Sequence, residues 1–476
     1  MNASPRAPHS GVVVAVLAGA GIVVSLMQTL IVPLIQDLPE LLDTSAANAS
    51  WAVTSTLLAA AVATPVFGRL GDLYGKRRLL LVCTVLLTLG SLICALSSDL
   101  IPVVAGRTLQ GFGIPLIPLG ISVMRDVMPP ERLGSSMALM SSSLGVGGAL
   151  GLPISAVIAQ KTNWHALFWL SATAGLVIGV LIRAIVPESP LRAGGRFDLL
   201  GAFGLGTGLL CFLLAVSKGG DWGWASTTTL GLFAAALIIL LLWGRWELRT
   251  PAPLVDLRVS AGRQVLMTNL ASVLIGFSMY AMSLTTPQLL QLPESTGYGL
   301  GQTMIQAGLW MAPGGLMMMA MSPFAARLTA TRGPKTALLI GSLIVAAGYG
   351  LGLVLMSAPW QVLVFSVLIS AGIGFAYAAM PALIMSAVPL SETAAANGLN
   401  SLARSIGTSS SAAVMGVILA HMTTALGSAT VPSEAGFRTT LALGAVAALI
   451  AALISLAVPG RRAPVPQPPA TVKASA

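Results

Sequence analysis

The chain has 476 residues, of which 55% are hydrophobic and only 8% carry a formal charge. Soluble domains carry roughly 25% charged residues, so this composition excludes an ordinary soluble protein and predicts that lipid surrounds most of the surface. The net charge of +10 does not indicate nucleic-acid binding, because the basic residues stand in short loops and not on one face of a folded domain.

Fourteen stretches along the chain are apolar and long enough to cross a bilayer, which takes about 20 residues. Backbone polar groups in lipid must be satisfied within the chain, so each stretch is predicted to be a helix. We therefore predict an all-α membrane protein. The expected spans are 11–36, 50–68, 79–98, 100–124, 135–159, 165–186, 199–217, 227–244, 265–288, 302–324, 336–357, 360–386, 396–420 and 437–459.

The basic residues are distributed unevenly between the two sets of loops. With the N-terminus in the cytoplasm, 21 of the 25 lysines and arginines fall in inner segments, and Arg404 is counted among them. Three fall in outer segments, and Arg107 lies within a span. Because cytoplasmic loops are enriched in Lys and Arg, we expect both termini in the cytoplasm.

The two halves of the chain are related by a weak internal repeat. The segment GRLGDLYGKR at 68–77 returns as ARLTATRGPK at 326–335. Repeats of this kind are typical of secondary transporters. We predict a six-helix bundle over 1–198, two linker helices over 199–258, a second six-helix bundle over 259–459 and a disordered cytoplasmic tail over 460–476.

The turn between the second and third spans carries the most specific motif of the chain. Its sequence matches the pattern G-x-L-x-D-x-x-G-[RK]-[RK], which is the first cytoplasmic signature of the major facilitator superfamily. The matching residues are Gly68, Leu70, Asp72, Gly75, Lys76 and Arg77.

Two further motifs lie in the fourth and fifth spans. Arg107 and Gln110 match R-x-x-Q-G-x-G, and Gly147 and Gly151 meet part of the pattern G-x-x-x-G-P-x-x-G-G, with the proline displaced to Pro153. Together the motifs resemble the fourteen-span drug–proton antiporter branch of that superfamily, of the kind that actinobacteria use to export drugs or metabolites.

The resemblance implies a fold and a function. The fold is two six-helix bundles related by an axis along the membrane normal, plus two inserted linker helices. The function is export of small lipophilic compounds in exchange for protons, by alternating access, from the bacterial cytoplasmic membrane. We expect a monomer surrounded by lipid, with a small-molecule substrate and no nucleic-acid partner. A uniporter or a proton-coupled importer on the same fold is the alternative.

We expect neither catalysis nor a cofactor, with the proton gradient as the energy source. The three cysteines lie in apolar stretches without metal-ligand spacing, and the sequence has no phosphate-binding P-loop. A membrane-embedded enzyme or receptor is a remote alternative, because no nucleophile–base set or metal cluster stands out in the spans.

The motif residues are candidates for a conformational gate. The resemblance implies that Asp72 lies against the cytoplasmic N-terminus of a helix that begins near Asn397, where the helix dipole favours a carboxylate. Positive-inside anchoring alone would also explain Lys76 and Arg77. In the fifth span, small residues allow close helix approach and a proline bends the helix, so Gly147, Gly151 and Pro153 are expected to seal the inner route.

One departure from the branch concerns charge inside the membrane. The branch commonly has L-D-x-T in its first span, whereas this chain has Met27 at the place of the acid. Arg107 is the expected central charge, but its guanidinium does not release a proton at working pH. Asp37, at the outer end of the first span, is the best-placed acid for proton uptake, and His165 is a second candidate.

Polar side chains within the spans are predicted to line a central cavity, since polar groups facing lipid are costly. Each could instead form a hydrogen bond between helices. With Arg107 and no acid at that depth, we expect neutral, zwitterionic or anionic lipophilic substrates to be preferred over dications. The candidate cavity residues are Gln28, Thr29, Gln110, Tyr280, Gln306, Trp310 and Asn400.

Overall fold

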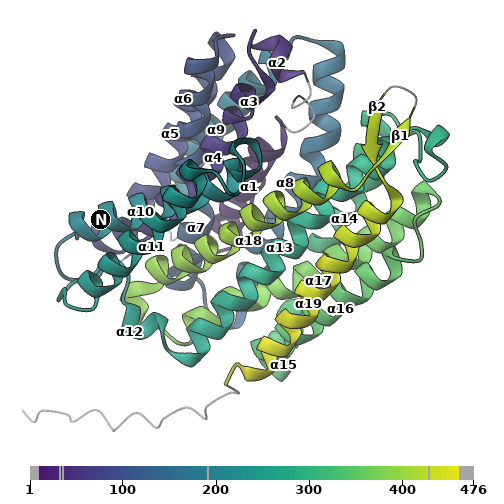
Figure 1. The fold of residues 1–476 in the computed structure, drawn as a ribbon. Helices are drawn as coiled ribbons and strands as arrows, with labels where there is room; N and C mark the ends of the chain where they lie inside the picture. Colours follow the sequence, from purple (N-terminus) through teal and green to yellow (C-terminus); the bar gives the residue numbers. More distant parts are fainter. Residues whose placement is uncertain (1–9, 32–33, 35–36, 190–191, 427–428, 460–476) are drawn as a thin grey trace, which may run out of the picture.

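The computed structural model describes residues 10–31, 34, 37–189, 192–426 and 429–459, and the predicted tail at 460–476 lies outside them. The described chain is almost entirely helical (Figure 1). Fourteen helices or helix pairs are long and apolar enough to cross a membrane, which confirms the predicted all-α membrane fold.

The first bundle contains six spans, and its fourth span is broken into two helices. A pair of short helices follows the first span, α2 (Leu38–Leu41) and α3 (Ala46–Ala49). The spans are α1 (Ser10–Thr29), α4 (Trp51–Tyr74), α5 (Lys76–Leu96), α6 with α7 (Leu100–Gly111 and Leu116–Val127), α8 (Pro130–Lys161) and α9 (His165–Ile185).

Two linker helices, α10 (Leu199–Trp222) and α11 (Thr227–Glu247), follow the first bundle, and the short α12 (Leu257–Ser260) leads into the second. α10 packs against α4 of the first bundle and against α18 of the second, whereas α11 packs on α10. The outer surface of α11 is apolar and exposed, as expected for a helix that faces lipid.

The second bundle repeats the six-span arrangement, again with one broken span. An antiparallel hairpin of β1 (Thr423–Leu426) and β2 (Ala429–Pro432), which the sequence did not predict, precedes the last span. The spans are α13 (Arg263–Gln291), α14 with α15 (Met304–Ala320 and Ser322–Arg332), α16 (Pro334–Gly352), α17 (Pro359–Met385), α18 (Thr393–His421) and α19 (Glu434–Ala457). Two 3-10 turns, η2 (Glu294–Thr296) and η3 (Leu390–Glu392), complete the bundle.

Some predicted spans differ from the helices in the structure. The first helix ends at Thr29, and Asp37 occupies the N-cap position of α2 instead of continuing the span. The fourth span is interrupted between Gly111 and Leu116, where Pro115 is the N-cap of α7. Proline has no backbone N–H to continue the helical hydrogen bonds, which accounts for the break.

The two bundles meet along two seams. In one seam α4 packs on α18, and in the other α8 packs on α14 and α17. Small residues allow the helices to approach closely: a Cβ at Gly398 would lie 2.8 Å from the carbonyl oxygen of Thr64, and one at Gly308 would lie 3.0 Å from the nitrogen of Pro153. The bundles diverge toward the end that carries α2 and the β hairpin (Figure 1).

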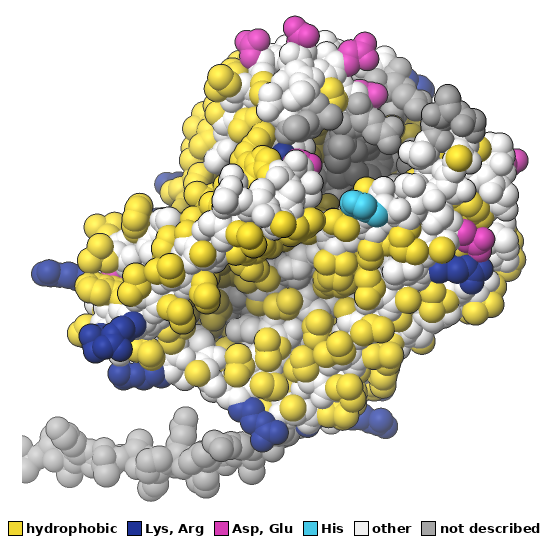
Figure 2. Space-filling model, in the orientation of Figure 1, with side chains coloured by type: hydrophobic (Ala, Val, Ile, Leu, Met, Phe, Trp, Pro, Cys, Tyr) yellow, Lys and Arg dark blue, Asp and Glu magenta, His cyan; other side chains and the backbone are white. Residues whose placement is uncertain are grey.

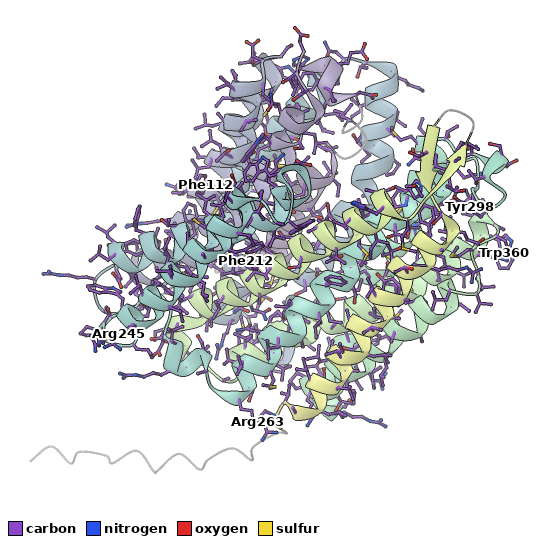
Figure 3. The ribbon with its side chains drawn as sticks, in the orientation of Figure 1. Phe112, Phe212, Arg245, Arg263, Tyr298 and Trp360 are labelled. Carbon is purple, nitrogen blue, oxygen red and sulfur yellow. The ribbon has the colours of Figure 1, made fainter. Side chains whose placement is uncertain are left out.

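Charged side chains gather at the two ends of the molecule. Lysine and arginine dominate one end and the acids lie mostly at the other (Figure 2). Arg245 and Arg263 lie at the first end, here called the basic end, and Tyr298 and Trp360 lie at the opposite, acidic end (Figure 3). This separation is the pattern that the positive-inside rule predicts for a cytoplasmic basic end.

Cysteine labelling tests this orientation. Ser295, in η2, is exposed at the acidic end, and Gly194, between α9 and α10, is exposed with open space at its Cβ position. In a protein whose native cysteines are replaced by alanine, we expect an impermeant maleimide to label Ser295→Cys on intact cells. It should label Gly194→Cys only after permeabilisation, and the reverse pattern would overturn the orientation.

Candidate functional site

The carboxylate of Asp72 joins the two bundles at the basic end. It is fully buried near the end of α4, and it accepts hydrogen bonds from the backbone N–H groups of Ala394 (3.2 Å) and Ala395 (2.8 Å). These N–H groups belong to the first turn of α18, where backbone N–H groups have no acceptor within the helix. We call this interaction the gate contact. The structure thus places Asp72 at the helix N-terminus near Asn397, as the motif implied.

A buried cation and a second carboxylate complete the gate contact. The ammonium of Lys76 lies 2.6 Å from Asp126 and 3.7 Å from Asp72, and it donates a hydrogen bond to the hydroxyl of Thr393 at 3.1 Å. Asp126 was not among the predicted site residues. It lies between Arg125 and Arg132, and nothing in this local sequence distinguishes it from a solvated loop acid. The charge of Lys76 offsets the two buried carboxylates, which would be costly if unpaired.

Glycines make room for this arrangement. A Cβ at Gly68 would lie 2.6 Å from the carbonyl oxygen of Ala394, so a larger residue would push α4 away from α18. Gly75 has φ +114, a conformation that favours glycine, and it ends α4 directly before α5 begins. Arg77 does not join the gate contact, since its guanidinium donates to the backbone carbonyl of Arg183.

The fifth-span candidates fall into two groups. Gly147 and Gly151 pack α8 against α1 within the first bundle: a Cβ at Gly147 would lie 2.5 Å from the carbonyl oxygen of Ile22. Pro153 instead contacts Gly308 of α14 across the second seam. Of these three residues, Pro153 is therefore the one that touches the opposite bundle.

Arg107 is buried and bridges three spans of the first bundle. Its guanidinium donates to the backbone carbonyls of Ala52 (2.9 Å) and Met27 (3.3 Å) and to the side-chain oxygen of Gln110 (2.6 Å). Gln110 in turn donates to Ser91 at 2.8 Å. In the described part of the chain no carboxylate forms an ion pair with Arg107. Carbonyl dipoles stabilise its charge instead.

A small cavity lies beside Arg107. Its lining includes Gln28, Thr56, Arg107 and Gln110, along with apolar side chains of α1 and α5 and Ile114 between α6 and α7. Two of the predicted cavity residues and the predicted central charge therefore meet at one place. This cavity belongs to the first bundle and not to the interface between the bundles.

Arg404 is a second cation within a span, and counting it among the loop cations was wrong. It lies about three turns into α18, roughly 16 Å from the start of the helix at 1.5 Å per residue. Its guanidinium donates to the hydroxyl of Ser401 at 3.0 Å, and its central carbon lies 4.8 Å from the ring centroid of Tyr377 on α17. A cation at such depth costs about 2.5–3.5 kcal/mol on insertion scales.

The remaining cavity candidates do not converge on one site. Thr29 donates to a carbonyl of its own helix, and Gln306 is an exposed residue that closes a capping box with Thr303. Trp310 donates to Gln302 at 3.0 Å. Asn400 bonds to Asn269 (2.9 Å) and Ser272 (2.7 Å) of α13, so it joins two helices. Tyr280 lies largely buried on α13.

The two candidates for proton uptake lie at the acidic end, far from the gate contact. Asp37 is exposed at the start of α2. His165, at the start of α9, interacts with Asn163 (2.6 Å) and Ser98 (3.2 Å). Neither forms a hydrogen bond with Arg107 in the described ranges. Across those ranges the structure also holds no group of three side chains able to bind a metal ion.

The sequence matches the model of a known protein family. The model for the Major Facilitator Superfamily matches residues 17–412 and 300–475, so the chain belongs to that superfamily. Its fourteen candidate spans accord with a multi-pass membrane protein of that superfamily.

Two of the relatives are named for drug resistance and export. The chain is 29% identical over 305 residues to the multidrug resistance protein B homolog of Mycobacterium tuberculosis, covering 63% of this chain but only 55% of that relative. It is 27% identical over 383 residues to the tetracenomycin C resistance and export protein of Streptomyces glaucescens, covering 80% and 70% of the two chains.

Solved structures share the fold at low sequence identity. The human organic anion transporter TETRAN superposes with a TM-score of 0.66 at 15% identity, covering 94% of this chain and all of that one. The proton:xylose symporter XylE, bound to a bromodeoxyglucose, gives the same TM-score and identity and covers 95% and 96%. At this identity the likeness shows the fold alone.

The gate contact predicts that Asp72→Asn slows transport. The amide keeps the shape but loses the charge, and a hydrogen bond to a charged group is worth about 1.5–3 kcal/mol. That loss would shift a two-state equilibrium roughly tenfold or more away from the closed basic end. We expect normal membrane insertion and a markedly lower initial rate in liposomes.

Asp43→Asn is the matched control for this variant. Asp43 is exposed at the acidic end with φ +45, a conformation that asparagine tolerates well. The control should transport at the unmodified rate. An Asp72→Asn protein that transports equally fast would contradict a functional role for the gate contact.

The bridging position of Arg107 predicts that Arg107→Ala abolishes transport. Removal of the guanidinium leaves two buried carbonyls and Gln110 without their donor. Arg107→Lys should restore only part of the rate, because one ammonium cannot reproduce the planar set of donors. Full activity in Arg107→Lys would show that charge alone is required.

Proposed function

We propose that this transporter exports small lipophilic compounds, drugs or metabolites, in exchange for protons by alternating access. The observation that carries the proposal is the gate contact, a buried carboxylate of one bundle on the helix N-terminus of the other. It is supported by the ribbons, which meet at the basic end and diverge toward the acidic end (Figure 1). Alternating access requires a state in which one end is closed in this way while the bundles separate toward the other end.

Export is favoured by the names of the relatives. The mycobacterial and streptomycete proteins are named for multidrug resistance and for resistance and export. If the basic end faces the cytoplasm, the structure corresponds to the state that releases an exported compound and takes up protons from outside. Asp37, exposed at the acidic end, is positioned to receive a proton in that state.

Import or uniport on the same fold is the second candidate. The proton:xylose symporter shares this architecture, and the first span of the present chain has no acid at the position usual for drug–proton antiporters. The direction of proton movement distinguishes the candidates. An antiporter moves substrate and proton in opposite directions, a symporter moves them together, and a uniporter moves no protons.

Purified protein in liposomes with an imposed pH gradient tests the proposal. The liposomes would contain a pH-sensitive dye and receive a panel of neutral, anionic, zwitterionic and cationic lipophilic compounds. We expect at least one compound to accumulate in exchange for protons, and dications to be poor substrates. Liposomes with Asp72→Asn protein control for leakage. Transport without a pH change, or with protons moving in the same direction, would refute the antiport.

A further inference from the structure

Arg107 and Arg404, the two arginines within membrane spans, differ in how many of their N–H donors form hydrogen bonds. An arginine side chain offers five N–H donors. Arg107 makes three hydrogen bonds, two of them to backbone carbonyls. Arg404 makes a single side-chain hydrogen bond, to Ser401 one turn earlier in the same helix. Most of the donors of Arg404 are therefore available to a ligand, which makes it the better anion-binding group of the two.

Arg404 forms no ion pair in the ranges that the structure describes. α18 packs against α13 and α17 in the second bundle, and none of these three helices contains an aspartate or glutamate. It also packs against α4, α7, α10 and α19, whose acids pair with Lys76, Lys218 and Arg438 instead. A membrane-embedded arginine without an acidic partner commonly faces a cavity or a substrate path.

The position of the guanidinium is set by an aromatic ring. The ring of Tyr377 lies under the Arg404 guanidinium at 4.8 Å, and the Tyr377 hydroxyl is held by the sulfur of Met279 at 3.2 Å. Tyr377 is almost fully buried, so the ring is fixed. An arginine that stacks on an aromatic face keeps its N–H donors in the guanidinium plane for a ligand.

A purely structural role explains Arg404 less well. Its hydrogen bond to Ser401 stays within α18 and joins no second helix. The close contact between α18 and α13 at this level is made by the backbone, since a Cβ at Gly276 would lie 2.5 Å from the Arg404 carbonyl oxygen. The side chain joins α18 to α17 only through the face of the Tyr377 ring, a contact that uses none of its N–H donors, and it remains partly exposed.

We infer that Arg404, positioned by Tyr377, binds the carboxylate of a lipophilic organic acid on the substrate path. The planar guanidinium matches a carboxylate through two parallel hydrogen bonds. The side chains that contact the guanidinium or its supporting ring, Ser401, Tyr377 and Met279, carry no charge, which suits a ligand whose body is lipophilic. This inference rests on the proposed function, to which it adds a substrate class.

Three probes of one shape test the inference by direct binding. They are 2-anthracenecarboxylate, its primary amide and 2-(aminomethyl)anthracene, which carry negative, zero and positive charge on the same fluorescent ring. Binding to the full-length protein in nanodiscs would be measured by fluorescence anisotropy, with empty nanodiscs as the background. We expect unmodified protein to bind the carboxylate most tightly.

Variants then assign the preference to Arg404. Arg404→Gln should weaken binding of the carboxylate by about tenfold or more and binding of the amide by less than about twofold. Arg404→Lys should give an intermediate affinity because its single ammonium cannot form the paired contact. Tyr377→Phe keeps the ring and should bind normally, whereas Tyr377→Leu should lose part of the preference. Arg263→Gln, an exposed arginine at the basic end, is the matched control.

The outcomes separate this inference from the proposed function. Equal weakening for all three probes in Arg404→Gln and Arg404→Lys would overturn the inference. So would unmodified protein that prefers the ammonium probe or binds none of the three. Proton exchange in liposomes is a separate measurement. If it fails while the Arg404-dependent preference holds, antiport is refuted and the anion site stands.

Discussion

The carboxylate of Asp72 on the N-terminus of α18 is the contact on which the arrangement of the two bundles depends. Apolar packing specifies helix positions poorly in a bilayer, because lipid tails are as apolar as leucine. Close approach of small residues and buried polar contacts must therefore define the closed state. Here both occur together: Gly68 allows α4 to reach α18, and Asp72 then accepts two backbone N–H groups. Lys76 lies between Asp72 and Asp126 and offsets part of their buried negative charge.

The linker helices contact only one of the two seams, and they do so through α10. α10 packs on both α4 and α18, and its Leu205 and Leu209 join a cluster that includes Leu58 and Leu402. The other seam, between α8 and α14, has no such cover in the described residues. A rocking motion that separates α4 from α18 must therefore also rearrange α10. Of the inserted pair, α10 packs on both sides of this seam, whereas α11 packs on α10.

Arg107 was the one central charge that the sequence predicted, but the structure places two arginines within the membrane spans, and their surroundings differ. Arg107 is engaged by carbonyls of α1 and α4 and by Gln110, which suits a residue that holds the first bundle together beside a small polar cavity. Arg404 retains free donors on the ring of Tyr377. Among the described residues, each bundle thus contributes one arginine and no carboxylate at that depth, and the proposed preference for anionic over cationic compounds rests on this charge balance.

The sequence by itself determined the class of protein and the fourteen spans, because hydropathy and loop charge are local signals, and the family resemblance carried by one glycine-bearing turn implied the place of Asp72. It did not find Asp126, whose partner Lys76 is 50 residues away, or recognise that Arg404 lies within a span. It also grouped polar residues into one cavity, whereas Gln306 caps a helix and Asn400 bonds to α13. Those outcomes depend on which helix faces which. In a chain of near-uniform hydrophobicity that choice is fixed by packing between distant segments, and only the tertiary structure contains it.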